Sequence, residues 1–209
     1  MFLFLVYYLQ GTLHYSAVKS GLAFLPFSAG IVVAASIASG QLPRVGPRPL
    51  MVGGMAAAAV GMAWFTQIKA DSGYLVHVLP AEIVMSLGMG FAFVALSSTA
   101  LIGVADRDAG VASALVNTMQ QVGGSLGTAL LNTIAASATA HYLSSHASGN
   151  RVAATVHGYT VAFTWGLGAL ILAAVISFML VAKQRTPLGA NDEGEETMFE
   201  QAEVLAGSL

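Results

Sequence analysis

The sequence predicts an all-α membrane protein, and three observations support this. The chain of 209 residues is 56% hydrophobic and only 9% charged, with a mean hydropathy of +0.74. Its apolar residues gather in runs of about 20, the length of helix that crosses a bilayer. It also contains 23 glycines, which membrane helices use where they pack closely. The absence of cysteine excludes a disulfide framework, a thiolate metal site and a cysteine nucleophile.

We predict one partial and five full spans. The partial span covers residues 1–11, about half the length needed to cross, which indicates the end of a helix whose beginning is missing. Pro80 is expected to bend the outer end of the fourth span. Residues 186–209 carry six of the ten acidic residues and are predicted to form a disordered tail. The full spans are expected at about 21–42, 49–68, 74–104, 109–138 and 159–182.

Loop charge predicts the orientation, since cytoplasmic loops favour Lys and Arg. The more basic set of loops carries Arg44, Arg48, Arg107, Lys183 and Arg185, and the other carries Lys19, Lys69 and Arg151. We therefore expect a multi-pass protein of the plasma (inner) membrane with the first set of loops and the C-terminus in the cytoplasm. The five histidines then lie on the outer side, either as interfacial loop residues or as a metal or pH-sensing cluster. Their spacing matches no common ligand motif, so we expect no metal site.

Polar side chains interrupt the span at 109–138. Asn117, Gln121 and Thr128 fall on one side of a helix, and three glycines lie on or beside the same stripe. Amides are costly against lipid, so this side must face protein or a wet cavity. The amides either form hydrogen bonds between helices or contact substrate and water. The glycines expected to allow close helix packing are Gly123, Gly124 and Gly127.

The stronger polar residues lie in the first, second, fourth and fifth spans, which we expect to form an inner layer, with the third and sixth spans facing lipid. The expected substrate path consists of Tyr8, Gln10, Ser86, Asn117, Gln121 and Thr128. Glu82 is the only acid well inside an apolar segment. It is either an interfacial acid near a helix N-terminus or a carrier of a proton or cation.

Known catalytic motifs do not occur in the sequence. There is no nucleophile elbow, pair of metal-binding acids, phosphate loop or HExxH, and Ser39-Gly40 lacks the first glycine of a rhomboid-type GxSG. Asp106, Arg107 and Asp108 are expected to form a turn, with Asp108 capping the next helix. We expect no enzyme, no catalytic residue and no cofactor. A net charge of −2 also argues against nucleic acid as a partner.

Several segments together resemble one family. YYLQGTLHYSAVKSG, GLAFLPFSAGIVVAA, LPRVGPRPL and GVADRDAGVASALVNTMQQVGGSLGTALL follow in this order. The order resembles the C-terminal part of the fourteen-spanner drug:proton antiporters of the major facilitator superfamily, the EmrB/QacA-like branch, over residues 7–182. The resemblance implies the C-terminal six-helix bundle of such a transporter, with its first helix truncated, facing a second bundle across a central cavity.

The resemblance also implies roles for individual residues. The Arg-Gly-Arg pattern of an inner-loop gate maps onto Arg44, Gly46 and Arg48, with Pro43 where an acid often accompanies it. The arginine often found before the fifth-span glutamine is Gln120 here. The implied function is proton-coupled multidrug efflux of amphipathic small molecules, with no activity of this half alone.

The expected partners are the lipid bilayer, an amphipathic substrate, protons, and either the missing N-terminal half or a second copy of the chain. The alternative function is that of a helical membrane accessory or interaction subunit without transport activity.

Overall fold

The computed structural model describes residues 1–146 and 150–180, and within them it confirms the all-α class, since no strand is formed. Three helical runs in this part of the chain are long and apolar enough to cross a membrane, namely Ala17–Val45, Tyr74–Ala100 and Arg151–Leu180. The predicted acidic tail lies outside the described residues. The elements are α1 (Phe2–Tyr7), the π-helix η1 (Tyr8–Thr12), α2 (Ala17–Ala23), α3 (Leu25–Val45), α4 (Pro47–Phe65), the π-helix η2 (Tyr74–Val78), α5 (Leu79–Ala100), the 3₁₀-helix η3 (Asp106–Asp108), α6 (Ala109–Ser145) and α7 (Arg151–Leu180).

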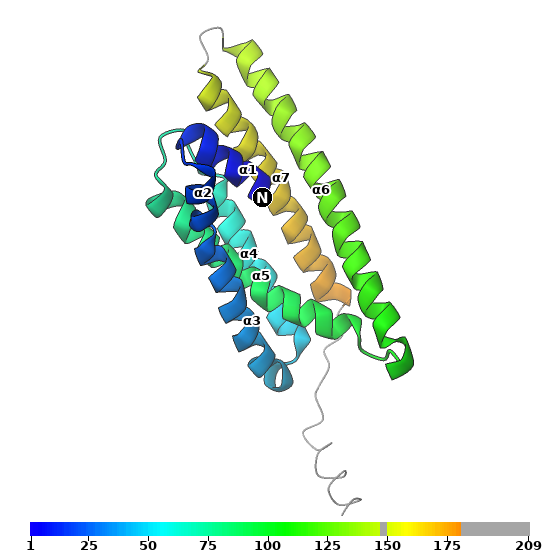
Figure 1. Cartoon of the computed structure of the whole chain (residues 1–209). Helices are drawn as coiled ribbons and strands as arrows, with labels where there is room; N and C mark the ends of the chain where they lie inside the picture. The colour runs from blue at the N-terminus through cyan, green and yellow to red at the C-terminus, as the bar shows by residue number, and fades with distance from the viewer. Residues whose placement is uncertain (147–149, 181–209) are drawn as a thin grey trace, which may run out of the picture.

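The helices form two groups joined through α4 and α7. In Figure 1, α3, α4 and α5 lie together, and α6 and α7 run side by side as a long antiparallel pair. The α3–α4 turn and the α5–α6 connection lie at one end of the bundle, together with the described end of α7. The start of α2 and the residues between α4 and η2 lie toward the other end. The loops therefore alternate between two ends, as in a chain that crosses a membrane repeatedly.

Glycines allow α4 and α5 to approach with backbone against backbone. A Cβ atom on Gly54 would lie 2.7 Å from the backbone nitrogen of Ala92, and one on Gly61 would lie 2.7 Å from that of Met85. On the α3 side of α5, a Cβ on Gly90 would lie 2.6 Å from the Cβ of Ala34. Helix α5 is therefore held tightly between α3 and α4, which is the close contact that small residues permit in membrane helices.

Aromatic side chains tie α1 to α4 and α7. The rings of Phe4 and Phe163 lie 5.9 Å apart, and those of Phe65 and Phe163 lie 5.5 Å apart. All three side chains are buried. The short first helix is thereby fixed against the centre of the bundle by contacts of the edge-to-face and tilted kind that aromatic pairs favour.

The turn between α3 and α4 depends on glycine. Gly46 has a φ of 76°, a conformation that L side chains rarely adopt. Two residues later, Arg48 donates a hydrogen bond of 2.7 Å to the Phe178 carbonyl oxygen, and its guanidinium lies 4.4 Å from the centre of the Phe178 ring. Arg48 thus joins the start of α4 to the last described turn of α7.

One local prediction is corrected. Asp108 lies at the N-cap position of α6, but its side chain caps no helix amide and instead lies 3.4 Å from the Arg107 Nε. The reason is its backbone, which has helical angles (φ −104°, ψ −5°) rather than the extended angles of a capping residue. At Pro80 the structure changes from the π-helix η2 to the α-helix α5, with the proline in the first turn of α5.

Candidate functional site

The polar stripe of α6 lies on an uncovered face. Asn117, Gln121 and Thr128 are exposed, and Ala135 is the one buried residue of this helix of 37 residues. No atom of another element lies within 4 Å of a Cβ placed on Gly123, Gly124 or Gly127. Within the described residues these glycines therefore contact no other helix, and their packing role stays a prediction.

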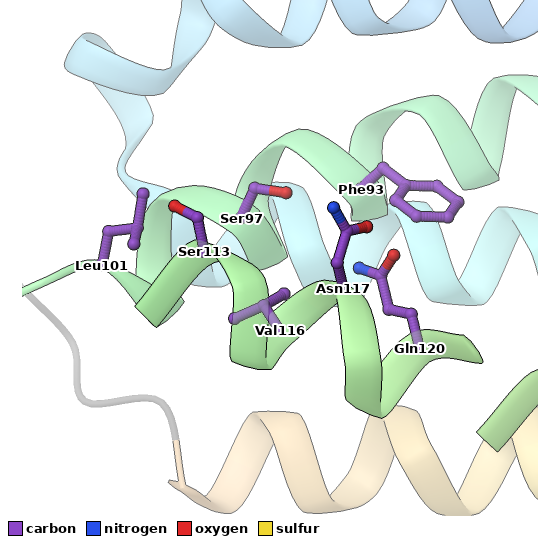
Figure 2. A pocket seen from close by; sticks show the side chains of 7 residues that line it. All are labelled: Phe93, Ser97, Leu101, Ser113, Val116, Asn117 and Gln120. Atoms are coloured by element: carbon purple, nitrogen blue, oxygen red, sulfur yellow. The ribbon is translucent and has the colours of Figure 1, made fainter. Parts of the chain in front are cut away.

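A polar cavity of about 190 Å³ lies between the second half of α5 and the start of α6. Figure 2 shows the Asn117 and Gln120 amides extending from α6 close to each other, with the Phe93 ring of α5 beside Asn117. The volume is below the about 300 Å³ of a typical ligand pocket. Its lining residues are Phe93, Ser97, Leu101, Ser113, Val116, Asn117 and Gln120.

The chemistry of this cavity suits an amphipathic molecule. The Phe93 ring and Leu101 offer apolar surface, while the Asn117 and Gln120 amides can donate and accept hydrogen bonds. Neither amide has a partner among the hydrogen bonds of the described residues, so both are available to a ligand or to water. Apolar walls with a few convergent polar groups are the usual composition of small-molecule sites.

Of the six predicted substrate-path residues, the cavity includes only Asn117. Gln121 and Thr128 continue along α6 away from it, and the Thr128 hydroxyl bonds the Gly124 carbonyl of its own helix. The cavity instead includes Gln120, which lies three residues after Asn117. The sequence did carry a signal for this second stripe, because Ser113, Asn117 and Gln120 have the 3–4 residue spacing of one helix face.

Tyr8, Gln10 and Ser86 lie elsewhere in the bundle. The Tyr8 side chain is 2% exposed, and its hydroxyl lies 2.8 Å from the Lys69 carbonyl and 2.7 Å from that of Ser72. Ser86 is fully buried and donates to the Ile83 carbonyl of its own helix, whereas Gln10 is exposed. The structure does not bring these three residues to the cavity, so their role in a path stays a prediction.

Glu82 lies in the first turn of α5 and is fully buried. Its Oε2 lies 3.4 Å from the Tyr74 hydroxyl, and its Oε1 has no hydrogen-bond partner. The described residues contain one salt bridge, between Arg107 and Asp108, so no basic side chain pairs with Glu82 there. A buried carboxyl without a basic partner is costly when ionised, and the role of Glu82 stays a prediction.

An apolar hollow of about 440 Å³ follows the α6–α7 pair. Gly127 and Leu131 of α6 face Trp165 and Gly166 of α7 across it. Trp165 is 62% exposed, which is high for a large aromatic side chain. This side of the pair therefore offers an apolar groove next to the polar stripe.

A bundle of long apolar helices with a polar face on one of them defines a helical membrane protein. The chain belongs to the Major Facilitator Superfamily, whose family model matches residues 1–128.

The chain is similar to three bacterial proteins whose names refer to resistance or export. It is 50% identical to the puromycin resistance protein pur8 of Streptomyces alboniger over 87% of this chain. It is 35% identical to the cephamycin export protein CmcT of Amycolatopsis lactamdurans over 89%, and 32% identical to the lincomycin resistance protein of Streptomyces lincolnensis over 93%. In each case the match spans 37% of the relative's length.

Proposed function

We propose that this chain forms the C-terminal half of a proton-coupled multidrug efflux antiporter of the EmrB/QacA-like branch, which exports amphipathic small molecules. The protein would lie in the plasma (inner) membrane with its C-terminus in the cytoplasm. The observation that carries the proposal is the uncovered polar face of α6 with its cavity against α5. Free amides on an apolar helix are stable only beside protein or water, and a drug path supplies both.

The uncovered face of α6 is also consistent with further helices that cover it in the whole transporter. Asn117, Gln121 and Gly124 are exposed, and the apolar groove between α6 and α7 lies beside them. Longer relatives carry additional chain that can cover both surfaces, since the match spans 37% of their length. We therefore propose that helices preceding this segment extend α1 and close the site, and that the chain alone does not transport.

Glu82 is proposed to carry the coupling proton. It is buried in a membrane helix, has no basic partner among the described residues, and has one oxygen without a hydrogen bond. Acidic side chains inside membrane helices serve as proton relays in pumps and transporters, which is the role proposed here for Glu82. Glu82 lies in the first turn of α5, whereas the cavity lies beside the second half of the same helix. Proton binding at Glu82 would therefore act on the drug path through movement of α5.

A chimera tests the proposal. This chain replaces the segment that it matches in the puromycin resistance protein of Streptomyces alboniger, and resistance is measured in an efflux-deficient bacterial host. We expect the chimera to confer resistance and the 209-residue chain alone to confer none. Asn117→Ala and Gln120→Ala are expected to lower resistance by about fivefold each, the effect of one lost hydrogen bond.

The matched control is Thr118→Ala. Thr118 is exposed on the same helix, but its hydroxyl bonds the Ala114 carbonyl of its own backbone and does not line the cavity. It is expected to leave resistance unchanged. Equal effects of Asn117→Ala and Thr118→Ala would refute the assignment of the cavity. A membrane-inserted chimera without resistance would instead favour the accessory-subunit alternative.

A further inference from the structure

The Tyr74 hydroxyl connects two helices near the ends of the second and fourth spans. It donates a hydrogen bond of 2.7 Å to the carbonyl of Ala23, the last residue of α2, and lies 3.4 Å from the Glu82 carboxyl of α5. Tyr74 itself is the first residue of the π-helix η2, directly before α5. One hydroxyl group therefore links the end of α2 to the buried acid of α5.

A phenolic hydroxyl has one hydrogen to donate, and this makes the link sensitive to the proton on Glu82. A protonated Glu82 can donate to the Tyr74 oxygen while Tyr74 donates to the Ala23 carbonyl, so both bonds form together. An ionised Glu82 can only accept. The single Tyr74 hydrogen can then bond either the Glu82 carboxylate or the Ala23 carbonyl, and the charge-assisted bond to the carboxylate is the stronger. The Ala23 carbonyl loses its donor in that state.

The bond to Ala23 is placed where α2 and α3 meet. The helix is interrupted at Phe24, and Pro26 in the first turn of α3 has no N–H group to offer the preceding carbonyls. A side-chain donor at Ala23 therefore stabilises a break in the second span. Loss of that donor loosens the part of α2 that packs beside η1 and α3.

Of the charged and titratable groups around this link, Glu82 and Tyr74 are the two that form it. The Tyr15 ring lies 6.4 Å from that of Tyr74, and the Lys19 ammonium lies 3.8 Å from the centre of the Tyr15 ring. His77 follows Tyr74 in η2, and α6 carries His141. Helices α3 and α4, which pack most closely on α5, carry no charged side chains except Arg44 and Arg48, at the opposite end of the bundle.

We propose that the proton on Glu82 decides whether Tyr74 ties α2 to α5, so that proton binding holds the outer end of the second span and proton release frees it. Tyr74 is a positioning residue in this scheme. The inference rests on the proposed role of Glu82 as the proton carrier. Because the experiment measures cysteine labelling and not transport, the link and the coupling role can be refuted separately.

The experiment follows a buried cysteine in α2. The chain has no native cysteine, and Ser20 is 2% exposed with an Oγ that has no hydrogen-bond partner, so Ser20→Cys is a mild reporter three residues before Ala23. The full chain is placed in lipid nanodiscs and labelled with a water-soluble maleimide at a series of pH values from about 5 to about 9. Val18→Cys, at a side chain 74% exposed, is labelled in parallel to normalise for thiolate formation.

We expect the normalised labelling at position 20 to rise by about fivefold with pH, the population shift that corresponds to one hydrogen bond. Adding Glu82→Gln keeps a neutral donor at position 82 and is expected to give low labelling at every pH. Adding Tyr74→Phe removes the bond to Ala23 in both states and is expected to give high labelling at every pH. The control Tyr15→Phe, which keeps the neighbouring ring, is expected to retain the rise.

Two results would overturn the proposal. One is labelling at position 20 that depends on pH in the Glu82→Gln variant as it does without that substitution. This result is sufficient by itself if Tyr74→Phe does not fold. The other is equal behaviour of Tyr74→Phe and Tyr15→Phe. If labelling at position 20 of the chain depends on pH while the chimera with Glu82→Gln still exports drug, the link is supported and the proposed coupling role is rejected.

Discussion

Gly54→Ala is expected to separate α4 from α5. The new Cβ would lie 2.7 Å from the Ala92 nitrogen and 2.7 Å from the Gly88 carbonyl oxygen. Both are backbone atoms, so neither can rotate away. Because comfortable contacts of this kind lie near about 3.5 Å, the helices must move apart by about 1 Å.

The free energy of this change follows from the contacts that surround Gly54. A gap of about 0.5–1 Å forfeits a quarter to a half of each dispersion contact, and overpacking of a core costs about 1–3 kcal/mol. Alanine recovers up to about 1 kcal/mol through its better helix propensity. We expect a net loss of about 1–2 kcal/mol, which for a chain of this length lowers Tm by about 2–8 °C.

The assay is thermal unfolding of the full chain in detergent, followed by the fluorescence of its two tryptophans. The matched control is Gly53→Ala, one residue earlier on the same helix, where no atom lies within 4 Å of the new Cβ. The control is expected to keep or slightly raise Tm. Equal Tm values for the two variants would refute the backbone contact between α4 and α5.

Three further predictions concern the inner turn and the face of α6. Arg48→Ala removes the bond to Phe178 and is expected to lower the unfolding free energy by about 1–2 kcal/mol, whereas Arg44→Ala, at an exposed position, leaves it unchanged in the same thermal assay. Gly46→Ala forces a side chain into a positive φ and is expected to cost about 1–3 kcal/mol, so an unchanged Tm would contradict the strained turn. Gly124→Leu is expected to leave Tm of the 209-residue chain unchanged but to lower resistance in the chimera, because its neighbours belong to the preceding helices; a loss of Tm in the chain itself would place those neighbours within it.

The sequence was sufficient for the fold class because hydropathy alone decides it. Runs such as Ile31–Ala35 and Ala169–Val175 have no other favourable environment than lipid or a helix core. Hydropathy was less informative about helix ends. α6 continues to Ser145 through Ala, Ser and Thr residues that are too polar to mark a span but still form a helix.

The positions of close packing were not readable from the glycine pattern. Gly123 and Gly127 of α6 have the four-residue spacing of a helix contact, and their packing role stays a prediction, whereas the backbone approaches within the described residues include those at Gly54, Gly61 and Gly88. A glycine permits an approach only where a neighbouring helix supplies atoms, and the order of helices in space is not encoded in any one segment.

The candidate site was predicted in part for a similar reason. Asn117 was expected from its polarity, but the selection of Gln120 over Gln121 depends on which face of α6 turns toward α5. Glu82 was identified from its isolation in an apolar segment, while its link to Tyr74 and Ala23 depends on contacts between residues 51 positions apart. Such contacts become visible only in three dimensions.

The most direct test of the drug-path assignment is thiol labelling of α6 in a cysteine-free form of the chimera. Asn117→Cys is compared with Leu172→Cys, a position 60% exposed on α7, using a membrane-impermeant, water-soluble reagent added to both sides of the membrane. We expect position 117 to be labelled and to be protected by puromycin, and position 172 to remain unlabelled because it faces lipid or a neighbouring helix. Equal labelling at both positions, or labelling at 117 that puromycin leaves unchanged, would contradict the assignment of this face to a drug path.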